Sequence, residues 1–195
     1  MPNKILIQEM DGTPKQIVFA DHAGDFNPAA ANDLRKTTDG SQELDVQLSL
    51  ASVADAAARQ STKVDLGENR AQAYHIRAAF EMAATPTAGD AIEIYWASSL
   101  ASSTGTANPG AVIGIDSAYV GYGLSLAASA KQLTWIGNFI CVATGTASVQ
   151  IADVGLFSPP ERYGSLIVKN ESNAAFHSDD VECHVVFDPI VSEVQ

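Results

Sequence analysis

The chain has little positive charge, little cysteine and no long apolar run. Its 195 residues include 11 Lys and Arg against 23 Asp and Glu, so the formal net charge is −12 at pH 7. A field of this sign repels phosphate backbones, and we expect no direct contact with nucleic acid. No apolar stretch approaches the roughly 20 residues of a membrane-spanning helix, and the first residues do not resemble a signal peptide. We therefore expect no membrane partner and synthesis in a cytoplasm.

Cysteine is equally scarce. Cys141 and Cys183 both lie in segments with a strand-like pattern, and no CxxC spacing indicates zinc binding or redox chemistry. The two residues would pair if their strands were neighbours. Free, buried thiols are the favoured interpretation in a reducing compartment.

The common catalytic motifs are missing as well. The sequence has no Gly-x-Ser-x-Gly elbow, no Gly-x-x-x-x-Gly-Lys-Ser/Thr loop and no Gly-x-Gly-x-x-Gly turn. Adjacent carboxylates such as Asp179 and Asp180 would face opposite ways on a strand. We expect no enzyme activity, no catalytic residue, no cofactor-binding residue and no cofactor.

What the chain does contain is strong alternation. In residues 72–82, apolar side chains recur at every second position and polar ones lie between them, and the pattern resumes at residues 92–96 after a turn. A period of two is the mark of a half-buried strand. Residues 133–142 are apolar on both faces, which predicts a central strand covered on each side.

About eight such segments, joined by turns rich in Gly and Pro, predict an all-β fold, an antiparallel β-sandwich of the jelly-roll type. This domain would cover residues 44–195. Residues 98–118 form a long loop of small and polar residues, and a loop of that length is usually functional or contact-forming.

Residues 1–43 are predicted to be an N-terminal arm outside this domain. Within the arm, residues 4–8 and 16–19 flank a turn and predict a hairpin. Asn27 and Pro28 are suited to begin a single helical turn that would run to Leu34.

Two clusters place histidine beside carboxylates, around His22 and His177. Asp21 and Asp25 accompany the first, and Asp179 and Asp180 the second. Turn chemistry explains both clusters, and neither has the three or four ligands of a metal site, so no metal residue is predicted. If either cluster held an ion, its oxygen ligands would favour calcium. The other histidines, His75 and His184, are predicted to face solvent or to form cross-strand pairs.

The aromatic residues allow two interpretations. Tyr119, Tyr122, Trp96 and Trp135 would form a sugar-stacking platform if they were exposed. Both tryptophans lie in strand-patterned segments, however, so the favoured prediction puts them in the core. Phe80 and Phe139 are predicted to be core residues for the same reason.

Several segments of the domain resemble stretches of tailed-bacteriophage structural proteins. The resemblance spans roughly residues 44–195, and the first 43 residues do not share it. The segments are residues 58–67 (ARQSTKVDLG), 79–89 (AFEMAATPTAG), 94–99 (IYWASS), 157–168 (FSPPERYGSLIV) and 186–195 (VFDPIVSEVQ).

This resemblance implies a virion component without catalytic residues. A capsid decoration (cement) protein is the leading hypothesis, with the arm and the loop at residues 98–118 holding neighbouring subunits. Its partners would be the major capsid protein or other virion proteins, and it would form a homo-oligomer. The alternatives are a tail or neck component of the virion and a carbohydrate-binding module for host attachment, in which the same loop would contact a host glycan.

Overall fold

The strongest alternation in the sequence becomes the longest pair of strands. The computed structural model describes residues 15–36, 43–68 and 70–190. Strand β5 (Ala73–Glu81) and strand β6 (Ala91–Ser99) confirm the predicted pair. In β5, Tyr74 and Ile76 are buried while His75 and Arg77 are half-buried, as a period of two requires.

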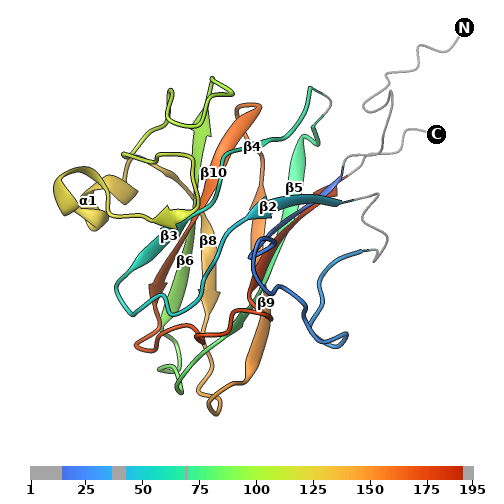
Figure 1. Ribbon diagram of the computed structural model, residues 1–195, viewed down its shortest axis with the longest axis vertical. Helices are drawn as coiled ribbons and strands as arrows, with labels where there is room; N and C mark the ends of the chain where they lie inside the picture. Colours follow the sequence, from blue (N-terminus) through green and yellow to red (C-terminus); the bar gives the residue numbers. More distant parts are fainter. Residues whose placement is uncertain (1–14, 37–42, 69, 191–195) are drawn as a thin grey trace, which may run out of the picture.

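The described residues form two β-sheets and two short helical segments (Figure 1). The remaining elements are β1 (Gln16–Ala20), β2 (Glu43–Gln47), β3 (Ala58–Gln60), β4 (Val64–Asp65), β7 (Ser117–Ala118), the 3-10 turn η1 (Tyr122–Leu124), α1 (Leu126–Ala130), β8 (Thr134–Ile140), β9 (Val149–Phe157), β10 (Tyr163–Glu171) and β11 (His184–Ile190). Among these residues, no helix has the length and apolar character that crossing a bilayer requires.

The first sheet has the strand order β2-β1-β11-β5-β9, and the second has the order β7-β3-β10-β6-β8, with β4 also paired to β10. The two sheets form two layers in Figure 1. The all-β prediction is confirmed. The prediction of purely antiparallel pairing is wrong at one place, because β1 and β2 run parallel.

The main core lies between the two sheets and is built around aromatic rings. Trp96 is fully buried, and its ring contacts those of Phe19, Phe157 and Phe187 at centroid distances of 6.5, 5.7 and 5.6 Å. Phe80 forms a second centre with its neighbouring rings. Large buried side chains of this kind supply most of the stabilisation of a sandwich.

Strand β1 belongs to this core, so the prediction of an arm outside the core is wrong for residues 16–20. β1 lies between β2 and β11, and all five of its residues are buried. Ile17 and Phe19 point into the main core, while Val18 and Ala20 pack on the outer face. The proposed hairpin partner, residues 4–8, lies outside the described residues.

The outer face of the first sheet is covered by the chain that follows β1. Phe26 and Leu34 pack there against Val18 and Val186. The predicted helical turn is confirmed as one hydrogen-bonded turn, in which Ala29 O accepts from the amides at positions 32 and 33; the segment forms no longer helix. His184 is buried under the same cover, although the sequence predicted an exposed or cross-strand position.

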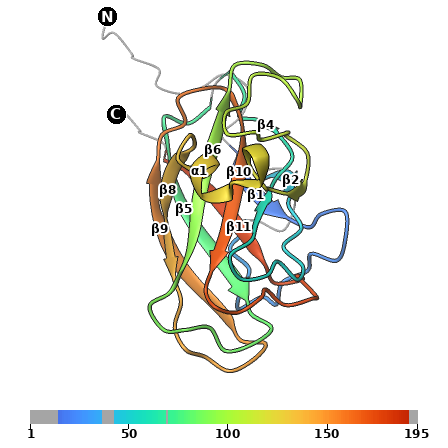
Figure 2. The same ribbon diagram turned by 90° about the vertical axis from the view of Figure 1, so that its left-hand side faces the viewer.

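Strand β8 is an edge strand, so the prediction of a central strand covered on both faces is wrong. It pairs only with β6. Its outer positions include Trp135 and Ile140, which are 57% and 52% exposed. α1 lies on the same outer side of the second sheet, as the two views show (Figures 1 and 2).

Candidate functional site

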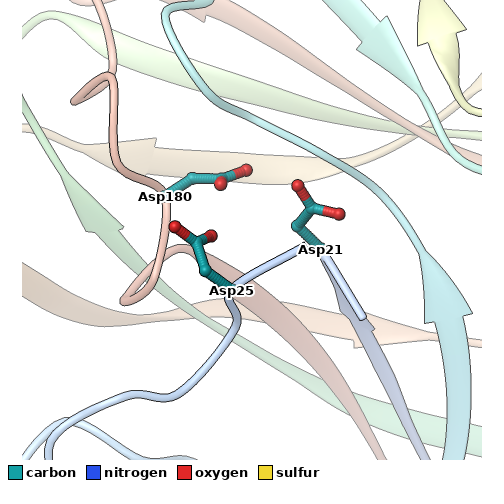
Figure 3. A group of neighbouring side chains, drawn as sticks. All are labelled: Asp21, Asp25 and Asp180. Carbon is teal, nitrogen blue, oxygen red and sulfur yellow. The ribbon is translucent and has the colours of Figure 1, made fainter. Parts of the chain in front are cut away.

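Three carboxylates from distant parts of the sequence meet at one end of the first sheet. Asp21 and Asp25 follow β1, and Asp180 precedes β11 (Figure 3). One oxygen of each lies within 4.8 Å of the other two. The structure thus joins the carboxylates of the two His–Asp clusters, which sequence reasoning had treated as separate.

Asp180 is the buried member of the group. Its Oδ2 accepts hydrogen bonds from the amides of Leu50 and Ala51, at 2.6 and 3.0 Å, and from the Ser49 hydroxyl at 3.2 Å. Burial raises the pKa of Asp180, and the negative charge of Asp21 raises it further, although the hydrogen bonds act in the opposite direction. The carboxylate therefore connects the loop before β11 to the chain that follows β2.

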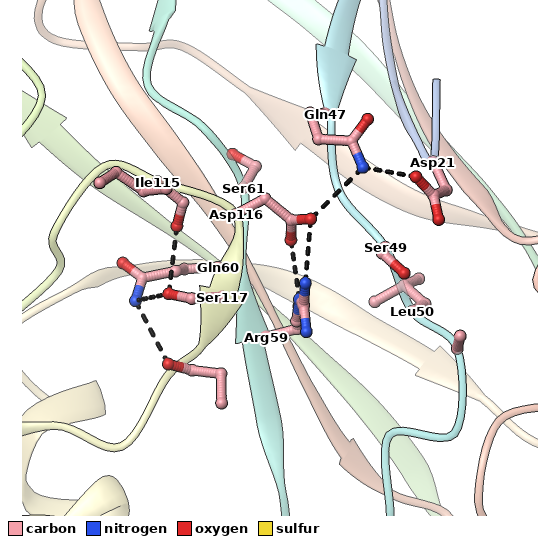
Figure 4. A network of polar contacts seen from close by, with 12 residues as sticks. Asp21, Gln47, Ser49, Leu50, Arg59, Gln60, Ser61, Ile115, Asp116 and Ser117 are labelled. Carbon is pink, nitrogen blue, oxygen red and sulfur yellow. Dashed lines mark hydrogen bonds and ion pairs between the residues drawn. The ribbon is translucent and has the colours of Figure 1, made fainter. Parts of the chain in front are cut away.

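A polar network fixes Asp21 from the other side (Figure 4). The side-chain amide of Gln47 donates to Asp21 Oδ1 at 2.5 Å and to Asp116 Oδ2 at 3.3 Å. Asp116 also accepts two hydrogen bonds from the Arg59 guanidinium, at 2.7 and 2.9 Å. The pKa of Arg59 is raised, chiefly by this hydrogen bonding with Asp116. The network links β2, β3 and the segment before β7.

Gly24 allows the turn to close on Asp21. A Cβ at this position would lie 2.5 Å from Asp21 Oδ2, which is closer than real Cβ contacts come. The cluster could offer oxygen ligands to a hard cation or share a proton. Each carboxylate can bind Ca²⁺ through one or two oxygens, and carbonyls or waters would have to supply the rest of its six to eight oxygen ligands.

The histidines do not join this group. His177 makes a local turn contact in which its Nδ1 lies 3.2 Å from the amide of Asp179. His75 Nε2 lies 3.3 Å from Asp153 Oδ1 on the neighbouring strand β9, so the predicted cross-strand pair is confirmed. The buried His184 accepts from the amide of Leu34 through Nε2, and burial lowers its pKa, which favours the neutral ring.

Both cysteines are free and buried, so they do not pair. Burial raises the pKa of Cys183 to about 12 and that of Cys141 to about 11. A thiol with so high a pKa is a poor nucleophile at neutral pH.

The four aromatic residues of the sugar-platform interpretation divide into two pairs. Trp96 and Tyr119 are buried, and the Tyr119 hydroxyl donates to Gly110 O at 2.6 Å. Tyr122 and Trp135 are 58% and 57% exposed. The prediction that Trp135 is a core residue is therefore wrong, whereas the same prediction for Trp96, Phe80 and Phe139 is confirmed.

The exposed tryptophan borders an open cleft on the outer face of the second sheet. This cleft has a volume of about 650 Å³ and lies between α1 and the outward side chains of β6, β8 and β10. Sequence reasoning missed it, because it requires knowledge of which strands are neighbours.

The loop at residues 98–118 is organised around one lysine. Lys63 Nζ, which lies between β3 and β4, donates to Ser99 Oγ at 2.9 Å and to the carbonyls of Ala101, Ser103 and Thr106 at 3.0, 2.7 and 2.9 Å. Partial burial lowers the pKa of Lys63. One ammonium therefore organises a stretch of loop that has little secondary structure of its own.

No protein-family model, curated protein or solved structure matches this chain.

Proposed function

We propose that this protein is a structural component of a tailed-bacteriophage particle, a capsid decoration protein without catalytic activity. The sequence resemblance over residues 44–195 supports this assignment, as does the two-sheet body, for which we propose a jelly-roll topology. Its partners would be the major capsid protein or another virion protein, with further copies of this chain.

The observation that carries the proposal is the exposed apolar side chains of the loop at residues 98–118, which Lys63 holds in place. Leu100, Ile113 and Ile115 are 76%, 47% and 52% exposed on a segment that has few other large side chains. All three belong to the one loop at residues 98–118, and exposed apolar surface offers a contact site for a partner. Such residues act as anchors when a partner covers them.

Hydrogen bonds also hold this loop in one conformation before any partner binds. Beyond the four contacts of Lys63, the side-chain amide of Asn108 donates to Thr104 O at 2.6 Å and to Val112 O at 2.9 Å. The amide of Ile113 donates to Gln60 Oε1 at 2.8 Å, which attaches the loop to β3. A loop that is ordered before binding loses less entropy when it binds.

The charge of the protein agrees with a position on the outside of the capsid. A net charge of −12 is unfavourable next to packaged nucleic acid, whereas it keeps an exterior surface soluble. Binding would come from the apolar anchors of the loop.

Binding of purified protein to undecorated capsids tests the proposal. Leu100→Ser and Ile113→Ser should each weaken binding by about tenfold or more, which corresponds to about 1.4 kcal/mol. Leu156→Ser is the matched control, because Leu156 is 68% exposed but lies on β9 of the other sheet. Equal binding by all three variants would contradict the role of the loop. Binding to tail or neck assemblies alone would contradict the capsid assignment.

A further inference from the structure

The cleft on the outer face of the second sheet combines an exposed indole with polar side chains held in fixed positions. Its floor comes from β6, β8 and β10, and its wall from α1 and the residues after it. Figure 2 shows α1 in front of the strands of this sheet. The side chains that carry the argument below are Glu93, Tyr95, Lys131, Trp135, Asn138 and Lys169.

A β-bulge directs Trp135 into this cleft. Ile94 pairs with Gly137, but the next residue, Tyr95, pairs with Trp135, so Ile136 is an extra residue in β8. Simple alternation from the buried Phe139 would place Trp135 inward. The extra residue instead buries Ile136 in the core and turns Trp135 outward, and bulges commonly re-aim a side chain beside a functional site.

A second bulge faces the first and helps to keep it in place. In β9, Ile76 pairs with Gly155 and Arg77 with Asp153, so Val154 is the extra residue. A Cβ on Gly137 would lie 2.5 Å from Val154 O. Only glycine therefore permits this approach of β8 to β9.

The indole is exposed, and one hydrogen bond orients it. Trp135 Nε1 donates to Asn138 Oδ1 at 3.2 Å, and the ring remains 57% exposed. The wall opposite carries the small side chains of Ala127 and Ala130, which leave the ring accessible. A flat apolar face that is open to water provides a stacking surface for a ligand.

The polar side of the cleft is also ordered. Glu93 Oε2 accepts from the Tyr95 hydroxyl at 2.9 Å and from Lys169 Nζ at 2.7 Å. The charged residues of the lining are Glu93, Lys131 and Lys169. Glu171 lies outside the lining but pairs with Lys169 at 2.5 Å and offsets the second positive charge. The charges of this region balance, which favours an uncharged ligand over an anionic one.

We propose that this cleft binds an uncharged saccharide, with one face of a sugar ring stacked on Trp135. The C–H groups on that face carry a weak positive charge that suits the negative face of the indole. Asn138, Glu93 and Lys131 offer donors and acceptors for the hydroxyl groups at the rim of the ring. The site is distinct from the apolar loop of the proposed function and does not depend on it.

Tryptophan fluorescence tests the proposal directly, since Trp96 is fully buried and Trp135 is the only other tryptophan. Chitotetraose and maltotetraose are the neutral probes, and polygalacturonate is the anionic probe. At least one neutral probe should cause a saturable change in emission, with a Kd of about 1 mM or tighter.

Calorimetry on folded variants then assigns the binding to the cleft. Trp135→Ala should weaken binding of the same neutral probe by about tenfold or more, and Asn138→Ala should weaken it as well. Leu156→Ala, on the other sheet, should leave it unchanged. The proposal is overturned if neither neutral probe binds, if only polygalacturonate binds, or if Trp135→Ala binds like the unaltered protein.

Discussion

Replacement by alanine should cost much more stability at Trp96 than at Trp135. Trp96 is fully buried among the rings of the main core, whereas Trp135 is 57% exposed at the cleft. The packing around Trp96 is also close on its polar edge, because a Cβ on Gly164 would lie 2.2 Å from the Trp96 Cζ2 atom. Replacement by alanine therefore leaves a cavity at one site and almost none at the other.

The expected magnitudes follow from this difference in burial. Removing a buried Trp side chain costs about 3–5 kcal/mol of unfolding free energy. For a chain of this length, that loss lowers the melting temperature by roughly 6–20 °C. Trp135→Ala removes mostly exposed atoms, and surface changes of this kind are usually within about 0.5 kcal/mol.

A third variant, Trp96→Phe, separates the effect of ring packing from that of the unpaired indole N–H. Trp96 Nε1 has no hydrogen-bond partner among the described residues. Phenylalanine at this position keeps an aromatic ring and removes the unsatisfied donor, so Trp96→Phe should lose much less stability than Trp96→Ala.

Urea denaturation followed by far-UV circular dichroism is the appropriate assay, since it does not depend on the tryptophans for signal. Equal losses of stability in Trp96→Ala and Trp135→Ala would refute the assignment of one to the core and the other to the surface. A loss below about 1 kcal/mol in Trp96→Ala would do the same, because it lies outside the range for buried aromatic residues.

Three further predictions concern the titratable groups. Cys141 and Cys183 should react with a thiol reagent at pH 8 only after urea unfolds the protein, because burial raises their pKa values to about 11 and about 12; fast reaction of the native protein would contradict this. Burial raises the pKa of Asp180 above 3.8 in the folded state, so the contribution of Asp180 to the unfolding free energy should fall as pH rises from 3.8 through that pKa. The difference in melting temperature between the unaltered protein and Asp180→Asn should therefore shift in favour of Asp180→Asn as pH rises across this range. EDTA should leave the melting temperature unchanged, since Asp21 and Asp180 already accept hydrogen bonds from the Gln47 side chain and the Leu50 amide; a drop of several degrees would reveal a bound ion.

Alternation in the sequence was sufficient to predict β5 and β6, because each strand has one face in the core and no irregularity that moves a large side chain. At β8 the same alternation wrongly predicted that Trp135 faces the core. The extra residue at Ile136 shifts the alternation by one position, and this puts Trp135 on the opposite face. A bulge is set by neighbouring strands, so periodicity within one strand does not reveal it.

The place of β1 in the first sheet could not be predicted from its local sequence pattern either. Its neighbours are β2 in parallel and β11 from the far end of the chain. A short strand of this kind resembles an arm until its long-range partners are known. Deleting residues 1–43 would therefore remove β1 from between β2 and β11. Loss of capsid binding after such a deletion would reflect the damaged sheet and not the loss of an arm.

The clusters of functional interest depend in the same way on tertiary contacts. Asp21 and Asp180 were each identified as members of separate turns, but only the fold brings them together. Lys63 carried no sequence signal, because its four acceptors lie 36 to 43 residues further along the chain. The long loop itself was predicted from its composition and length.

Saturation of undecorated capsids by the purified protein tests the central claim most directly. Increasing amounts of protein are mixed with capsids, the capsids are sedimented, and the bound copies per capsid are counted. A decoration protein should saturate at a fixed number of copies, and electron microscopy should show them at regular positions on the outer surface of the lattice. Absence of binding, or binding that rises without a plateau and without ordered positions, would contradict the proposed function.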